Sequence, residues 1–373
     1  MFDEYSFGIE EEYFLADAEN KTVARGIPDA FFQELKRRTD GRVKGEMLRA
    51  QVEAATVRHV DLAAARAELR FLRQTAGAIA ARYGLAILAV GTHPTATWIG
   101  LEQTPHERYD AVMEDLQMVG QRNLLCGLHV HVELPDPRQR VDVMTRMLPY
   151  LPLFIALATS SPFWRARETG LKGYRLAAYD ELPRTGVPEL FRNVAEYEAY
   201  IAALVQAGVI EDSSFVWWAI RPSLKLPTLE LRAPDSCTRV EDSIAIAALY
   251  RALARFLVRD PLHNAEISAV TRALVIENKW RAQRYGVHGT FVDVAGEGAI
   301  SVGEMLERTL AAVRADAEVL GGLAEVERCR EIVACGTSAD AQLAVFAAAQ
   351  GRSDSRSDAL RAVTDWIAGE TLS

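Results

Sequence analysis

Hydrophobic and polar positions alternate with a period of two residues in several short stretches of the chain. In residues 7–15 the large apolar side chains are interrupted by three consecutive glutamates, Glu10, Glu11 and Glu12. Side chains of a strand point alternately to opposite faces, so Glu10 and Glu12 share one face and Glu11 lies on the other. Two carboxylates on one face suit a divalent metal, although an edge strand charged against aggregation gives the same pattern. Glu11 faces the apolar side and is expected to need a buried arginine, lysine or backbone partner.

The stretch 127–134 has the clearest alternation. Its apolar residues face a core, and His129, His131 and Glu133 point the other way. A lone histidine on a strand is usually a hydrogen-bonded bystander, but two at i and i+2 on a polar face favour a metal ligand.

Two further stretches repeat this logic. Residues 48–56 place Gln51 and Glu53 on one strand face, although their alanine content also allows a helix. In 228–232, Glu230 and Arg232 share a face, which is consistent with a site or with a simple surface ion pair.

Longer stretches with a helical period of about 3.6 residues follow and separate the strands. The clearest spans 62–83, between the N-cap residue Asp61 and the terminating Gly84. Other helices are expected at 30–38, 106–122, 141–158, 194–206, 240–259, 263–285, 303–320, 324–334, 338–350 and 358–369, and further strands at 85–90 and 215–222. Strands come first and helices last, which predicts an α+β fold with a mainly antiparallel sheet. We expect a single domain over 1–373, with a strand-rich core at about 5–237 and a helical part at about 240–373.

Composition narrows the class of protein. The 373 residues include 42 Lys and Arg against 51 Asp and Glu, a formal net charge of −9, so no nucleic-acid partner is expected. The four cysteines show no CxxC spacing and the N-terminus has no apolar leader, which predicts a cytoplasmic protein with reduced thiols. No apolar run approaches the roughly 18 residues of a membrane helix, so no membrane partner is expected.

The polar strand faces together offer carboxylates and an imidazole for one cavity. Such an oxygen-rich set suits Mg²⁺ or Mn²⁺ better than Zn²⁺. Arg175, Arg221 and Arg232 lie near the acidic strands in sequence and would neutralise phosphoryl oxygens. The chain contains no GxxxxGK[ST], HExxH or GxSxG motif, so a P-loop, a zinc protease and a serine hydrolase are all disfavoured. The arginine-rich segment 165–193 lacks periodicity and is either a lid or phosphate clamp or a solvated connector.

Ten blocks, in order along residues 5–290, resemble the carboxylate-amine ligases of the glutamate-cysteine ligase type 2 family. They are GIEEEYFL at 8–15, QVEAAT at 51–56, GTHP at 91–94, GLHVHVEL at 127–134, SSPFW at 160–164, TGLKGYR at 169–175, PRTG at 183–186, IRP at 220–222, TLELRAPD at 228–235 and ENKWRAQRYG at 277–286. The sequence departs from the family pattern at Glu133 and at Lys172-Gly173, which we expect near the substrate mouth.

The resemblance implies a glutamine-synthetase-like fold, in which a curved antiparallel sheet forms an active-site funnel, helices pack on its outer face and the C-terminal region is helical. It implies metal ligands at Glu10, Glu12, Glu53, His129 and Glu230. It also implies phosphate or substrate clamps at Arg175 and Arg232, with Arg221 as a further nucleotide-binding residue. ATP and Mg²⁺ or Mn²⁺ are the expected cofactors, and a homodimer is the expected assembly.

The activity implied is ATP-dependent amide formation, of the γ-glutamylcysteine type, between a small amino acid and an amine through an acyl phosphate. A metal-dependent amidohydrolase that needs no ATP is the main alternative, since the same metal site serves both. A guanidino phosphotransferase and a binding protein without activity are further alternatives.

Overall fold

The computed structural model describes residues 4–294, 296, 298–352 and 355–373. Its strands are β1 (Phe7–Asp17), β2 (Val43–Gly45), β3 (Gln51–Ala55), β4 (Leu85–Leu88), β5 (Leu128–Glu133), β6 (Phe163–Trp164), β7 (Arg167–Glu168), β8 (Ile220–Pro222), β9 (Thr228–Leu231), β10 (Thr290–Val292) and β11 (Ala299–Ser301). Its α-helices are α1 (Asp29–Arg38), α2 (Leu62–Arg82), α3 (Glu107–Gln121), α4 (Arg140–Met147), α5 (Leu151–Ala158), α6 (Tyr174–Tyr179), α7 (Val194–Gln206), α8 (Val240–Arg259), α9 (Ala269–Tyr285), α10 (Val302–Val319), α11 (Leu323–Glu327), α12 (Cys329–Cys335), α13 (Ser338–Gln350) and α14 (Arg356–Thr371). Short 3-10 helices lie at η1 (Pro137–Gln139), η2 (Leu148–Tyr150), η3 (Ser213–Phe215) and η4 (Gly286–His288).

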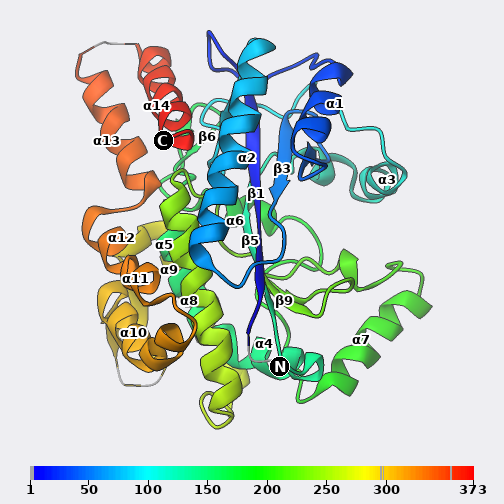
Figure 1. Cartoon of the computed structure of the whole chain (residues 1–373), viewed down its shortest axis with the longest axis vertical. Helices are drawn as coiled ribbons and strands as arrows, with labels where there is room; N and C mark the ends of the chain where they lie inside the picture. The colour runs from blue at the N-terminus through cyan, green and yellow to red at the C-terminus, as the bar shows by residue number, and fades with distance from the viewer. Residues whose placement is uncertain (1–3, 295, 297, 353–354) are drawn as a thin grey trace.

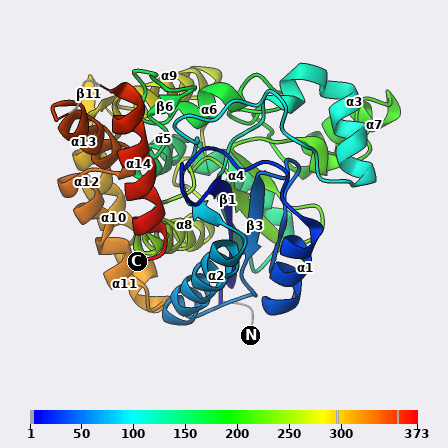
Figure 2. The same cartoon turned by 90° about the horizontal axis from the view of Figure 1, so that it is seen from above.

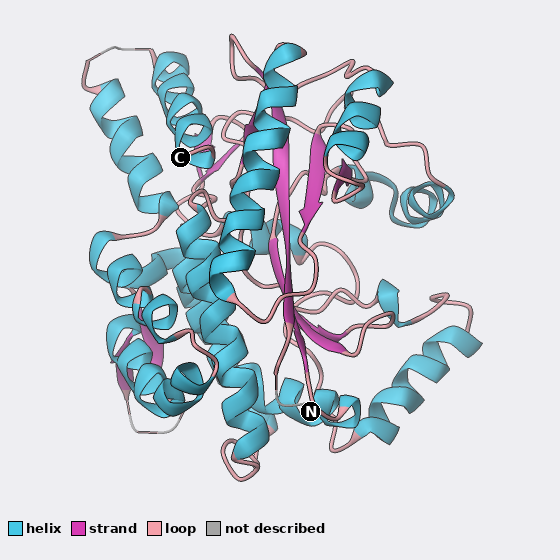
Figure 3. Cartoon of the chain, in the orientation of Figure 1, coloured by secondary structure: helices cyan, strands magenta, loops and turns pink. Residues whose placement is uncertain are grey.

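A seven-stranded sheet forms the centre of the molecule, in the order β2-β3-β1-β5-β9-β8, with β4 paired to the C-terminal end of β1. The paired neighbours described in this sheet are all antiparallel. Helices surround the strands, and β1 runs through the middle as the longest of them (Figure 3). The prediction of an α+β fold with a mainly antiparallel sheet is therefore confirmed. Among the described residues after 240, the small β10-β11 hairpin departs from the helical C-terminal part that was expected.

Helices α2 and α8 cover one face of this sheet, as Figures 1 and 2 show. Against them lie the apolar side chains that alternate along the strands, including Ile9, Tyr13, Val52, Val130 and Leu231, all at most 1% exposed. The predicted start of α2 is confirmed, because the Asp61 side chain accepts a hydrogen bond from the Ala64 amide. The C-terminal helices stack beyond α8, and α14 returns to pack on β4.

Glu11 points into this covered face and is fully buried. Arg73 of α2 donates two hydrogen bonds to its carboxylate, at 2.9 and 2.8 Å, and Tyr13 donates a third at 2.6 Å. Burial alone would raise the pKa of Glu11, but the Arg73 charge and these hydrogen bonds outweigh it, and the net pKa is lowered. Arg73 also donates to the carbonyls of Cys237 and Thr238. The expectation of a buried cationic partner for Glu11 is confirmed, and this partner joins β1, α2 and the chain leading into α8.

Several predicted element boundaries are wrong. Of the strand expected at 215–222 only β8 forms, because the preceding residues donate backbone hydrogen bonds to the loop at Arg184 and Gly186 instead. The helix expected from 263 begins at Ala269, where Ser268 and Thr271 form a capping box. The helix expected at 324–334 is split into α11 and α12. Residues 351–357 also read as a short polar linker from the sequence, and of these residues 353 and 354 lie outside the described part of the chain.

Two stretches meet a length-and-composition test for a membrane span, Pro137–Ala158 and Leu323–Gln350. The expectation that no apolar run comes close to such a length was therefore too strong. In the structure each stretch is divided into short helices, and 83% of the first apolar window and 44% of the second are buried.

Candidate active site

The uncovered face of the sheet forms the floor of a cavity of about 490 Å³. Strands β1, β3, β5, β8 and β9 supply the floor, and α3, α6 and the segment around η3 supply the walls. The eight residues predicted for the site all line this cavity: Glu10, Glu12, Glu53, His129, Arg175, Arg221, Glu230 and Arg232. Strand alternation identified six of them, which converge in space although they are distant in sequence: Glu10, Glu12, Glu53, His129, Glu230 and Arg232. Arg175 and Arg221 were predicted from their positions near the acidic strands and from the family resemblance.

Strand register explains how these side chains meet. Antiparallel pairing sets Glu12 opposite Glu53 and Glu10 opposite His129. It also sets Glu230 opposite His131. Residues directly opposite each other on one face have neighbouring side chains, so each polar position of β1 gains a polar neighbour on the next strand.

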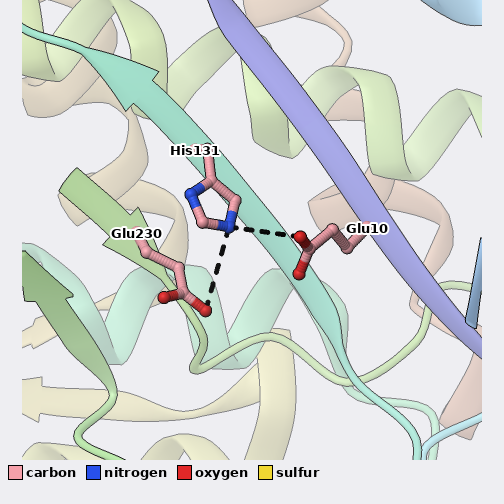
Figure 4. Close-up of side chains that lie close together, drawn as sticks. All are labelled: Glu10, His131 and Glu230. Atoms are coloured by element: carbon pink, nitrogen blue, oxygen red, sulfur yellow. Dashed lines mark ion pairs between the residues drawn. The ribbon is translucent and has the colours of Figure 1, made fainter. Parts of the chain in front are cut away.

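One potential ligand group consists of Glu10, His131 and Glu230, whose ligand atoms all lie within 4.8 Å of one another (Figure 4). His131 Nε2 lies 3.5 Å from Glu10 Oε1 and 3.9 Å from Glu230 Oε1. Its Nδ1 is held by the Thr228 hydroxyl at 2.9 Å. His131 was not among the predicted ligands, although it shares the polar face of β5 with His129. Strand alternation placed both histidines on that face but did not show which of them joins the ligand group.

His129 lies beside this group, with its Nδ1 3.4 Å from Glu10 Oε2. Both of its ring nitrogens are buried, and neither has a hydrogen-bond partner among the described residues. Burial, together with the nearby Arg232 charge, lowers the pKa of His129. A neutral imidazole with an unused nitrogen is the form that ligates metals.

A second group consists of Glu12, Glu46 and Glu53, again with ligand atoms within 4.8 Å of one another. Burial and then the neighbouring carboxylates raise the pKa of Glu46 to about 8 and that of Glu53 to about 7. Lys44 pairs with Glu53 at 3.0 Å, but this lysine is largely exposed. Glu46 follows β2 in a turn without periodicity, and no pattern in the sequence identified it.

These residues fit a divalent metal. The first group and the adjacent His129 offer imidazole nitrogens without a hydrogen-bond partner beside carboxylate oxygens. The second group is three close carboxylates with little compensating charge, which favours a cation between them. Oxygen-dominated sets suit Mg²⁺ or Mn²⁺.

Two arginines bind the carboxylate of Glu230. Arg221 donates to its Oε2 at 2.7 Å, and Arg232 donates to its Oε1. Burial alone would raise the pKa of Glu230, but Arg232 and Arg221 lower it far below its usual range. Arg221 also donates to the carbonyls of Ser214 and Val216, at 3.0 and 2.9 Å. Its guanidinium is therefore used mainly to fix Glu230 and the cavity wall.

Arg175 reaches the cavity from α6 and is 2% exposed. Its Nη1 donates to the Pro234 carbonyl at 3.2 Å, while its Nε has no partner among the described residues. The guanidinium packs directly over Gly127, where an added Cβ would lie 2.2 Å from Arg175 Nη2. The glycine before β5 is thus required by this close approach. Segment 165–193 is in part a wall of the site, since Tyr179 and Leu182 also line the cavity.

The residues that depart from the family pattern lie elsewhere, contrary to expectation. Glu133 is bound by Arg58 at 2.8 Å and does not line the cavity. Lys172 forms an ion pair with Asp340 of α13, away from the lining residues. Neither these two residues nor Gly173 lines the cavity.

Comparisons with known proteins agree on the family. The sequence-family model of glutamate-cysteine ligase family 2 matches residues 6–362 of this chain. A protein named "Putative glutamate--cysteine ligase 2" from Bradyrhizobium sp. (strain ORS 278) is 56% identical over 370 residues, which cover 99% of this chain and 88% of that protein. A relative with the same name from Rhodospirillum rubrum is 44% identical over 372 residues, or 99% of this chain and 96% of that protein.

Solved structures show the same fold at low sequence identity. A glutamate-cysteine ligase from Francisella tularensis in complex with AMP has a TM-score of 0.72 at 12% identity, over 99% of this chain and 89% of that one. A bifunctional glutathione synthetase from Pasteurella multocida has a TM-score of 0.72 at 14% identity, over 98% of this chain and 52% of that one. The sequence match along nearly the whole chain establishes that this protein belongs to glutamate-cysteine ligase family 2.

Proposed function

We propose that the protein is an ATP-dependent carboxylate-amine ligase that joins a small amino acid to an amine. The observation that carries this proposal is that two clusters of carboxylates, two histidines and three buried or half-buried arginines line one cavity. The names of the relatives and the AMP bound to a neighbour of the same fold support ATP as the co-substrate.

The proposed reaction has two steps. A substrate carboxylate oxygen attacks the γ-phosphorus of ATP, the bond to the β-phosphate oxygen breaks, and ADP leaves behind an acyl phosphate. The amine nitrogen then attacks the acyl carbon, loses a proton, and inorganic phosphate leaves as the amide forms. Phosphoryl transfer of this kind depends mainly on positioning and on charge stabilisation.

Mg²⁺ or Mn²⁺ would be held by Glu10, Glu12, Glu53, His129 and Glu230, with His131 and Glu46 beside them. When bound, the metal supplies positive charge to phosphate oxygens. The protein contributes fixed ligand positions: Thr228 holds the His131 ring, and the Gly127 amide donates to Glu12 Oε2 at 2.6 Å. These contacts orient the donors before substrates arrive.

Arg175 and Arg232 are proposed to stabilise the charge that develops on the transferred phosphoryl group. Both line the cavity, and each has a buried Nε without a partner among the described residues. Arg221 is proposed to act near the nucleotide chiefly by holding Glu230, because its contacts are already committed. Such fixed guanidinium groups need no reorganisation during the reaction.

Glutamate as the acid and cysteine as the amine are the substrates named by the family, and we propose a γ-glutamylcysteine-type product. The alternative of an amidohydrolase that works without ATP is not favoured, because the matched family and relatives are named ligases.

The deciding experiment measures ADP and phosphate release by the purified protein with ATP, Mg²⁺, glutamate and cysteine. The proposal expects release that depends on both acid and amine, in step with formation of the amide. Turnover of an amide substrate with no nucleotide present would overturn it.

We further propose a cytoplasmic location and a homodimer, as the sequence analysis predicted. Cell fractionation and light scattering of the purified protein test these two points. A periplasmic or membrane fraction, or a monomer at micromolar concentration, would overturn them.

A further inference from the structure

Six cationic side chains line the cavity, and most of them either pair with a carboxylate or already have a role in the proposed reaction. They are Lys44, Arg108, Arg175, Arg221, Lys225 and Arg232. Lys44, Arg221 and Arg232 form ion pairs with carboxylates of the floor, and Arg175 is packed against backbone carbonyls. Arg108, Arg175 and Lys225 have no carboxylate within 4.0 Å among the described residues, and Arg175 is already assigned to the phosphoryl group. Lys225 is exposed on the loop between β8 and β9, where water screens its charge.

Arg108 differs from Lys225 because neutral groups hold its guanidinium in place. Its Cζ lies 4.6 Å from the centroid of the Phe215 ring, and its Nη2 lies 3.5 Å from the Ser214 carbonyl oxygen. A ring and a carbonyl orient the guanidinium without cancelling its charge. The half-buried Arg108 therefore presents an oriented, uncompensated positive charge to the cavity.

The surroundings of Arg108 favour a strong interaction between its guanidinium and an anion. The same helix, α3, adds Val112 and Leu116 to the cavity wall. Apolar neighbours exclude water and make a charge-assisted hydrogen bond stronger than it is at an open surface. The wall thus combines one guanidinium with apolar side chains, which is a suitable environment for a carboxylate.

A second anionic group on the acid substrate needs such a partner. The floor already carries five carboxylates, namely Glu10, Glu12, Glu46, Glu53 and Glu230. In the proposed reaction, Arg175 and Arg232 stabilise the phosphoryl group as it is transferred to one carboxylate of the acid. A dicarboxylic acid bound in this way has one carboxylate left over, and that group is repelled by the floor unless a cation on the wall meets it.

We infer that Arg108 binds the non-reacting carboxylate of the acid substrate and so selects dicarboxylic amino acids over acids with one carboxylate. The inference rests on the proposed function and assigns a specificity residue within it. Arg108 acts on substrate binding, whereas Arg175 and Arg232 act on phosphoryl transfer.

The test compares glutamate with its α-amide, an isostere that keeps the γ-carboxylate and loses only the second charge. The wild-type enzyme is expected to lose about 10- to 100-fold in kcat/KM on this change, the effect of one charge-assisted hydrogen bond. Arg108→Met should lose a similar factor with glutamate and should no longer distinguish the two acids. The KM for ATP should stay within about twofold. Arg108→Lys, which keeps the charge, should recover part of the discrimination.

Arg122→Met is the matched control, because Arg122 ends the same helix, pairs with Glu181 at 2.9 Å and does not line the cavity. It should behave as wild type, and thermal melts of all variants check folding. Arg108→Met that keeps full discrimination overturns the inference, as does a wild-type enzyme that uses both acids equally. A raised KM for ATP with unchanged discrimination also overturns it, since Arg108 would then serve the triphosphate. Failure of the wild type to release phosphate with any acid and amine overturns the proposed function instead.

Discussion

The two faces of β1 carry the same side chain and give it opposite tasks. On the covered face, Glu11 is fully buried and receives hydrogen bonds from Arg73, Tyr13 and Ser243. On the open face, Glu10 and Glu12 lie among other carboxylates and two histidines, with much less compensating charge. Glu11 is complete within the protein, whereas its neighbours are arranged to be completed by a ligand.

The two faces of β1 thus separate stability from function. A buried, saturated ion pair is costly to break but adds no chemistry. A cluster of like charges lowers the stability of the folded protein, and binding of a cation restores it. Changes on the covered face should therefore alter folding, and changes on the open face should alter metal binding and catalysis.

The largest expected effect is on the covered face. Arg73→Met leaves the Glu11 carboxylate buried without its cation, so the free energy of unfolding should fall by about 3–5 kcal/mol. Urea unfolding measures this. Adding Glu11→Leu to Arg73→Met removes the orphaned charge and should recover much of the loss. A loss below about 1 kcal/mol in the single variant would show that the pair is not a main support of the fold.

The next effect belongs to catalysis on the open side. Arg175→Met should lower kcat roughly 10³-fold, about 4 kcal/mol of transition-state stabilisation, because a fixed positive partner of the phosphoryl group is lost. Steady-state release of phosphate measures it. Arg167→Met is the control, since Arg167 is exposed and lies outside the cavity lining. Less than a tenfold loss for Arg175→Met would contradict its proposed role.

A smaller effect concerns pH and the stability of the metal-free protein. Glu46 and Glu53 have pKa values of about 8 and about 7 in the folded protein, above their ordinary value of 4.5. Between pH 4.5 and 8 the folded state therefore binds more protons than the unfolded state. The free energy of unfolding of the metal-free protein should fall as the pH rises through this range.

Glu46→Gln removes the largest of these shifts. The variant should gain about 1–3 kcal/mol over wild type at pH 8 and little at pH 5, without metal. Denaturant unfolding at both pH values measures the difference, and the comparison between variants cancels the other titrating groups. An equal difference at both pH values would show that the carboxylates do not repel one another.

The smallest effect is expected at Arg221. Arg221→Lys keeps a charge near Glu230 but loses the bonds that the guanidinium makes to the Ser214 and Val216 carbonyls. We expect a loss of about tenfold in kcat/KM, mostly through misplaced Glu230. A loss as large as that of Arg175→Met would instead give Arg221 a direct role in phosphoryl transfer.

Strand alternation predicted much of the sheet and the site because a period of two fixes which side chains share a face. It separated Glu11 from its neighbours and picked the carboxylates and the histidine of the cavity floor that were predicted as metal ligands. It did not find Glu46, which lies in a turn. Nor did it find Arg108, which lies on helix α3 and not on a strand with a polar face. It also did not show that Arg73 is the partner of Glu11, since that contact depends on how α2 packs against the sheet. Long-range packing of this kind leaves no local pattern.

Titration of the protein with Mn²⁺, monitored by electron paramagnetic resonance, shows whether the carboxylates of the open face hold a metal. The wild type should bind Mn²⁺, and Glu53→Gln and Glu230→Gln should each lower the affinity by about 10-fold or more while the fold is retained. Glu11→Gln, on the opposite face, should alter stability and leave the Mn²⁺ affinity of the remaining folded protein unchanged. Unaltered Mn²⁺ binding in both Glu53→Gln and Glu230→Gln would contradict the account, because the carboxylates of the open face would then hold no metal.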